Sequence, residues 1–134
     1  MPTLNAETLP IVAQNDMVIV RQAVRARAAG IGMSIVDQTK IVTAASELAR
    51  NTLVYGGGGT VVMELLEEGG RRGLRLTFED HGPGIPDIDK ALTDGYTTGG
   101  GMGMGLSGSK RLVNDFDIKS TVGEGTCVTI ARWK

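Results

Sequence analysis

The residues best suited to chemistry are an aspartate at the end of a predicted strand and a glycine-rich loop further along the chain. Asp80 follows an alternating apolar run that includes Leu76 and Phe78. The loop, GGGMGMG over 99–105, leads into a helical pattern that begins near Leu106. Glycine lets the backbone approach a ligand closely, and amides at a helix start carry partial positive charge that suits phosphates. Together these features predict a nucleotide with its base near Asp80 and its phosphates at the loop.

A second pair of polar residues lies on a predicted helix. Glu47 and Asn51 are four residues apart, so their side chains are neighbours one turn apart. They lie beside an apolar stripe that includes Ala45 and Leu48 and should pack on a sheet. Taken alone, such a pair is expected to be two surface residues. It becomes a candidate for chemistry because a glycine-rich phosphate loop exists elsewhere in the chain.

Composition limits the classes of protein. A chain of 134 residues with 41% hydrophobic residues is expected to form one domain, 1–134, with a real core. A formal net charge of −1 argues against nucleic acid as the main partner. Cys127 is the single cysteine, and no zinc-ligand cluster is evident. We find no signal-peptide pattern and no apolar run long enough to span a bilayer, so we expect a cytoplasmic protein without membrane contact.

The elements that must position these residues can be predicted from periodicity and from capping residues. Pro10 should confine the first strand to a sheet edge, and Gly30 should close the first helix. Ser34 begins a capping-box-like start, with Asp37 at the position where Glu or Gln is preferred. The predicted strands cover 8–13, 60–67, 73–80, 117–121 and 126–133. The predicted helices cover 15 or 16 to 29, 34–55, 86–95 and 106–116.

This order of elements predicts a single-domain α/β sandwich with a helix layer over a mixed, mostly antiparallel sheet, rather than a doubly wound array. On the first helix, Arg21 and Arg25 fall on one face. A solvated charged surface is the simpler interpretation of that face. A docking surface for an acidic partner is the alternative.

Four short motifs follow one another along the chain with the spacing of a known superfamily. They are ELARN over 47–51, DHGPG over 80–84, GMGMGL over 101–106 and GEGT over 123–126. Together they resemble the N, G1, G2 and G3 boxes of the GHKL (Bergerat-fold) ATPases and kinases, and the resemblance covers about residues 35 to 130. The runs SELARN, GPGIPDI, DGYTTGGGMGMGL and KRLVNDF are most similar to the anti-sigma-regulatory serine/threonine kinases, in particular the RsbT-type switch kinases of the stressosome.

The resemblance implies an ATP- and Mg²⁺-dependent serine/threonine protein kinase. Kinases of this type phosphorylate a STAS-domain antagonist or scaffold protein and then activate a PP2C-type phosphatase. Asp80 would accept a hydrogen bond from the exocyclic amine of adenine, whereas guanine presents a carbonyl there. Asn51 would offer an oxygen to Mg²⁺, and Glu47 would orient or deprotonate the hydroxyl nucleophile. The other positions that the resemblance assigns to nucleotide contact are Gly82, Gly84, Thr98, Gly101, Gly103, Met104, Gly105, Leu106 and Thr126.

One departure from the family pattern concerns the terminal phosphate. Related kinases often carry an arginine in the loop, where this chain has Gly101. Lys110 or Arg111 either compensates for it or simply covers the helix surface, and His81 is interpreted as a variable position beside Asp80. Two rival functions have the same fold. One is an anti-sigma factor that sequesters a sigma factor, and the other is a water-using ATPase, which is disfavoured because no transducer domain follows the motifs.

Overall fold

A computed structural model of the chain describes residues 3–88, 92 and 106–134. In chain order the helices and strands are β1 (Thr3–Ile11), α1 (Gln14–Gly30), α2 (Ile35–Arg50), the π-helical turn η1 (Asn51–Tyr55), β2 (Gly59–Glu68), β3 (Arg71–Asp80), α4 (Leu106–Arg111), β4 (Asp115–Thr121) and β5 (Gly125–Trp133). No helix in these residues is long and apolar enough to cross a membrane.

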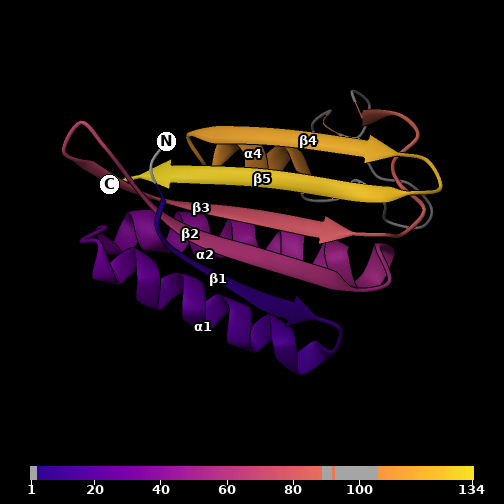
Figure 1. The fold of residues 1–134 in the computed structure, drawn as a ribbon, viewed down its shortest axis with the longest axis horizontal. Helices are drawn as coiled ribbons and strands as arrows, with labels where there is room; N and C mark the ends of the chain where they lie inside the picture. The colour runs from indigo at the N-terminus through magenta and orange to yellow at the C-terminus, as the bar shows by residue number, and fades with distance from the viewer. Residues whose placement is uncertain (1–2, 89–91, 93–105) are drawn as a thin grey trace.

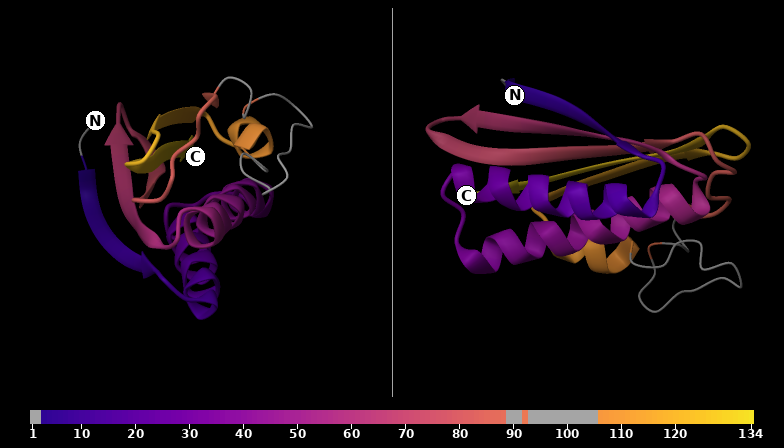
Figure 2. Two further views of the ribbon diagram at one scale, coloured as in Figure 1. Left: turned by 90° about the vertical axis from the view of Figure 1, so that its right-hand side faces the viewer. Right: turned by 90° about the horizontal axis from the view of Figure 1, so that it is seen from below.

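The five strands form one sheet in the order β1-β2-β3-β5-β4. All four neighbouring pairs are antiparallel, so the α/β sandwich is confirmed and its sheet is antiparallel rather than mixed. The helices lie on one face of the sheet (Figures 1 and 2). Pro10 lies in β1, and β1 is an edge strand, as its proline predicts.

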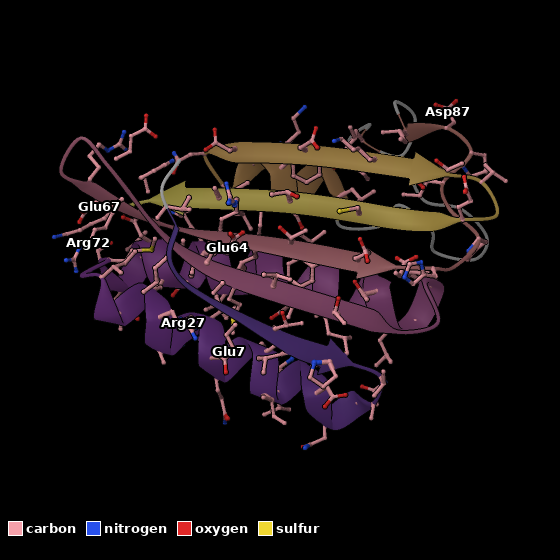
Figure 3. All side chains as sticks on the ribbon, viewed as in Figure 1. Glu7, Arg27, Glu64, Glu67, Arg72 and Asp87 are labelled. Atoms are coloured by element: carbon pink, nitrogen blue, oxygen red, sulfur yellow. The ribbon has the colours of Figure 1, made fainter. Side chains whose placement is uncertain are left out.

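The core lies between the helices and the sheet. On α1 it is formed by Val20, Val24 and Ala28, which recur at a spacing of one helical turn. The buried side of α2 packs beneath strand residues that include Met63 and Leu76. Arg27, which lies beside this buried stripe of α1, pairs with Glu7 on β1 and so ties the first helix to the edge strand (Figure 3).

The helix starts differ in how well they were predicted. Ser34 caps α2 as expected, because its hydroxyl accepts a hydrogen bond from the Asp37 amide at 3.1 Å. For α1 the predicted cap at Asn15 or Asp16 is wrong, because the cap is Ala13. Asp16 instead lies in the first turn, where its carboxylate accepts hydrogen bonds from the Val12 and Ala13 amides at 2.9 and 3.0 Å. An acidic side chain near a helix start is therefore not always the cap itself.

Two boundaries are also corrected. The first strand begins at Thr3 rather than at residue 8, because it pairs with β2 along that whole length. The helix predicted over 106–116 ends at Arg111, since Phe116 joins β4 and pairs with Ile130. Tertiary strand pairing therefore overrides a helical pattern in the last residues of that segment. The short helix predicted over 86–95 falls largely on residues outside the described part of the chain.

Candidate functional site

A pocket opens between the C-terminal end of α2, the turn η1 and the ends of β3 and β5. Figure 1 shows these strand ends at the same end of the molecule as the close of α2. Leu48, Phe78 and Val128 form apolar parts of the wall. The predicted site residues that line this pocket are Asn51, Asp80, Gly84, Leu106 and Thr126. Residues that are more than half of the chain apart in sequence therefore line the same pocket.

Asp80 is the last residue of β3, and its side chain is buried. Its Oδ1 accepts two backbone hydrogen bonds, from the Gly82 amide at 2.9 Å and from the Thr126 amide at 3.2 Å. Its Oδ2 faces Gly56, where a Cβ would lie 2.5 Å away from that oxygen. Two main-chain donors therefore hold one carboxylate oxygen in place, and the described hydrogen bonds leave the second oxygen as an acceptor in the pocket.

The turn after β3 is thin because glycines come together there. A Cβ on Gly82 would lie 2.7 Å from the carbonyl oxygen of Gly56. Gly84 has φ +78°, and a Cβ there would lie 2.5 Å from the carbonyl oxygen of Thr121. Gly82 and Gly84, predicted to contact the nucleotide, are therefore required here because a side chain would clash with the neighbouring backbone. Gly56 was missed, since the residues directly after the helix predicted over 34–55 were given no role in the site.

The helix carrying the candidate polar pair changes its winding at Asn51. An uninterrupted helix was expected to Tyr55, but Asn51–Tyr55 forms a π turn, with the Gly56 amide donating to the Asn51 carbonyl at 2.9 Å. The Thr52 hydroxyl donates to the Leu48 carbonyl at 2.9 Å. Such π turns occur frequently at functional sites. This one places Asn51, Thr52 and Tyr55 together on the pocket wall.

Glu47 and Asn51 do not stand in equivalent places. Asn51 lines the pocket, while Glu47, one turn earlier on α2, is half-buried and outside the pocket lining. In the described residues, no group of three or more His, Cys, Asp and Glu side chains is placed to hold a metal ion. A divalent cation at Asn51 would therefore take most of its ligands from bound phosphates and water.

Thr126, predicted to contact the nucleotide, holds Asp80 through its main chain, because its amide donates to the carboxylate. The Thr126 hydroxyl lies 2.8 Å from the Ser120 hydroxyl instead. Residues 3–88, 92 and 106–134 do not include Thr98, Gly101, Gly103, Met104 and Gly105, so the predicted phosphate loop lies outside the described part. Leu106, which follows that loop, is buried at the start of α4.

Comparison with known proteins identifies a family that matches most of this chain. Residues 36–134 match the family model of the histidine kinase-, DNA gyrase B- and HSP90-like ATPases. The chain is 46% identical over 123 residues to the serine/threonine-protein kinase RsbT of Bacillus subtilis, covering 92% of each chain. It is 29% identical over 128 residues to an anti-sigma F factor of Anoxybacillus flavithermus, covering 90% of this chain and 86% of that protein.

A solved structure agrees with the fold. The crystal structure of the RsbU and RsbW domains of a Mycobacterium tuberculosis protein matches with a TM-score of 0.64 at 23% sequence identity. The match covers 100% of this chain and 33% of that longer chain. At this identity it supports the architecture alone. Together with the relatives, it confirms the resemblance that the four motifs indicated.

Proposed function

We propose that this chain, which belongs to the family of histidine kinase-, DNA gyrase B- and HSP90-like ATPases, is a partner-switching serine/threonine kinase. It transfers the terminal phosphate of ATP to a STAS-domain antagonist or scaffold protein and, once released, activates a PP2C-type phosphatase. The prediction of a serine/threonine protein kinase is borne out by the family and by the 46% identical relative. The observation that carries the site is the carboxylate of Asp80, which is anchored through one oxygen with the other toward the pocket.

Adenine recognition follows from the geometry of that carboxylate. The Gly82 and Thr126 amides fix Oδ1, so the orientation of Oδ2 is set before any ligand arrives. An exocyclic amine donates to this oxygen, whereas the carbonyl of guanine would face it as a second acceptor. Leaving both groups unsatisfied costs about 1–3 kcal/mol. The apolar wall, including Phe78 and Val128, suits the faces of a purine ring.

The phosphate end of the site is assigned to Asn51 and to the loop that precedes Leu106. Asn51 lines the same pocket as Asp80, and its side-chain oxygen is the type of ligand that Mg²⁺ accepts alongside phosphate oxygens and water. When bound, the cation neutralises charge that develops on the transferred phosphoryl group. The amides of Gly103, Met104, Gly105 and Leu106, with Thr98 and Gly101, are proposed to hold the phosphates.

Glu47 is proposed as the catalytic carboxylate. It lies one helical turn before Asn51 and is half-buried, so it lies close to the cation ligand without lining the base pocket. A carboxylate in that place can orient the serine hydroxyl of a docked partner and accept its proton as the phosphoryl group is transferred. The partner must dock on this side of the molecule, because its oxygen must come within about 3–3.5 Å of phosphorus.

The exposed side of α1 is a candidate for part of the docking surface. Arg27 is already paired with Glu7, which leaves Arg21 and Arg25 as the basic residues of that helix to meet an acidic partner. Exposed Val18, three residues before Arg21 and seven before Arg25, provides apolar area beside them. A solvated charged face stays the alternative for these two arginines.

An anti-sigma factor is the second candidate function, because relatives at 29% identity carry that name. Its output would be sequestration of a sigma factor rather than release of a phosphorylated partner. The two functions differ in what ATP does to a complex. In the kinase switch, the added phosphate carries about two negative charges, which favour release from a site that holds the product nucleotide.

The test is co-purification with candidate STAS-domain proteins from the same genome, before and after addition of Mg·ATP, with mass spectrometry of the partner. We expect ATP, but not a non-hydrolysable analogue, to convert a stable complex into free kinase and phosphoserine product. Dissociation without phosphate transfer, or a tight complex formed only with a sigma factor, would favour the anti-sigma function.

The same assay tests the role of Glu47. Glu47→Gln should still bind Mg·ATP but transfer phosphate roughly 10²–10⁴-fold more slowly, because it lacks the general base. Asn51→Ala should instead weaken nucleotide binding in a metal-dependent way. Glu68→Gln, an exposed residue at the end of β2, is the matched control and should transfer at the wild-type rate. Wild-type turnover in Glu47→Gln would require another base.

A further inference from the structure

A serine on the edge strand β4 lies in the same row of the sheet as the two residues that define the base pocket. Ser120 of β4 is paired with Thr126 of β5, and Thr126 is paired with Asp80 of β3. Ser120 is half-buried and does not itself line the pocket. Its influence on a bound base must therefore pass through the pocket residues that it contacts.

The Ser120 hydroxyl joins the turn after β3 to the β4–β5 hairpin. Its oxygen accepts a hydrogen bond from the Ile85 amide at 2.8 Å. It also lies 2.8 Å from the Thr126 hydroxyl and 3.1 Å from the Gly125 carbonyl oxygen. Ile85 and Thr126 both line the pocket. From outside the pocket lining, the Ser120 hydroxyl thus contacts two residues, Ile85 and Thr126, that form the lining.

Counting protons decides how these groups are arranged. A serine hydroxyl has one proton to donate and two lone pairs that accept. The Gly125 carbonyl can only accept, so it must take the Ser120 proton if it is to be satisfied by this contact. Thr126 then donates its own proton to Ser120, whose second lone pair holds the Ile85 amide. This arrangement gives every group in this half-buried cluster a partner within the protein, as polar groups shielded from water generally require. The reverse direction would leave the Gly125 carbonyl without its Ser120 donor.

We propose that Ser120 is a positioning residue that fixes the Thr126 hydroxyl as a hydrogen-bond acceptor toward the pocket and thereby sharpens selection of an aminopurine nucleotide over an oxopurine nucleotide. This inference rests on the proposed ATP site. With its proton committed to Ser120, Thr126 turns only lone pairs to the ligand. The pocket lining then offers two acceptors from paired residues of neighbouring strands, Thr126 Oγ1 and Asp80 Oδ2. An exocyclic amine has two N–H groups to offer them or their bridging waters.

Removal of the Ser120 hydroxyl should change selectivity and not only affinity. In Ser120→Ala the Thr126 proton loses its acceptor and becomes free to rotate into the pocket, where it can donate to the carbonyl of guanine. We expect the ratio of ATP to GTP affinity to fall by roughly tenfold, a size set by one unsatisfied buried polar group. A role limited to bracing the turn would lower both affinities by the same factor and leave that ratio unchanged.

The experiment is calorimetric titration of Mg·ATP and Mg·GTP into the wild-type chain, Ser120→Ala, Ser120→Thr and Ser46→Ala, each checked for folding by thermal melting. Ser120→Thr keeps the hydroxyl and should restore the wild-type ratio. Ser46→Ala is the matched control, because its hydroxyl donates to the Val42 carbonyl within α2 and does not line the pocket.

A second variant isolates the path through Thr126. Thr126→Val removes the hydroxyl whose direction Ser120 is proposed to set, so adding Ser120→Ala to it should leave the ATP to GTP ratio unchanged. Failure of the wild-type chain to bind ATP would overturn the proposed function. Normal ATP binding with an unchanged ratio in Ser120→Ala would overturn this inference while the kinase function stands.

Discussion

Two aspartates near opposite ends of α2 are held by different kinds of partner. Asp80 lies against Gly56, just beyond η1, and accepts only main-chain donors among its described hydrogen bonds. Asp37 lies in the first turn of α2 and pairs with the guanidinium of Arg132 at 2.7 Å. Arg132 also donates to the Leu112 carbonyl at 2.9 Å, so this ion pair joins α2, β5 and the segment that follows α4.

The difference separates an acid that binds from an acid that holds the fold together. A carboxylate paired with a cation has its charge compensated within the protein. Two amides on one oxygen fix a carboxylate in position but leave its other oxygen able to accept from a ligand. Carboxylates of the second kind, at a strand end and beside a pocket, are the ones worth testing as binding groups. This contrast predicts that mutation of Asp80 changes nucleotide affinity and that mutation of Asp37 changes the stability of the fold. The opposite pair of results would refute it.

The largest expected effect is at Asp80. Asp80→Asn replaces an acceptor by an amide that must turn its NH₂ either to the backbone donors or to the ligand, so we expect ATP affinity to fall by roughly 100-fold or more. The fold should persist, because the change is isosteric. Calorimetric titration together with a thermal melt measures both. Asp37→Asn is the control and should bind ATP as the wild-type chain does. Unchanged ATP affinity in a folded Asp80→Asn variant would remove this residue from the site.

A smaller effect on the same site is expected from Gly56. An alanine there would place its Cβ 2.5 Å from Asp80 Oδ2 and force the carboxylate to move. We expect Gly56→Ala to weaken ATP binding by about tenfold, the size of one displaced hydrogen bond to a charged group. Gly30→Ala, at the end of α1, has nothing within 4 Å of its Cβ and is the matched control. Equal affinities in the two variants would mean that Oδ2 is not the oxygen that meets the base.

The contrast between these aspartates also shows what could be predicted from sequence. Asp80 was identified because a strand pattern ends there and a glycine motif follows, and the Ser34 cap of α2 was identified because capping depends on residues close in sequence. The order of elements was sufficient to predict the sandwich. Each of these signals is local or lies in the succession of motifs.

What was missed depends on contacts between distant segments. The row from Ser120 through Thr126 to Asp80 arises from strand register, which no local pattern contains. The closeness of Gly56 to Asp80 arises from packing of the turn before β2 against the end of β3. The π turn after Asn51 replaces a helix that local propensity continues equally well. For the same reason the helix predicted through Phe116 was too long, because pairing with Ile130 decides that residue. Register and packing, rather than composition, limit such predictions.

The smallest expected effect concerns the pH dependence of Asp37. The hydrogen bond from Arg132 lowers the pKa of this carboxyl below its ordinary value, against the opposing effect of burial. A carboxyl whose pKa is lower in the folded state binds its proton more readily when unfolded, so it stabilises the fold above the unfolded pKa of about 3.9. That contribution is lost as the pH falls from there through the lowered folded value.

Urea unfolding of the wild-type chain and Asp37→Asn across this range measures that contribution. We expect the wild-type midpoint to exceed that of Asp37→Asn at pH 7, with the difference disappearing as the carboxyl becomes protonated below about pH 4. Asp117→Asn, an exposed position on β4, is the control and should leave the midpoint unchanged. A wild-type advantage that persists undiminished in acid would mean that the shape of the side chain, rather than its charge on Arg132, secures α2. Asp37 would then no longer serve as the ion-paired counterpart of Asp80.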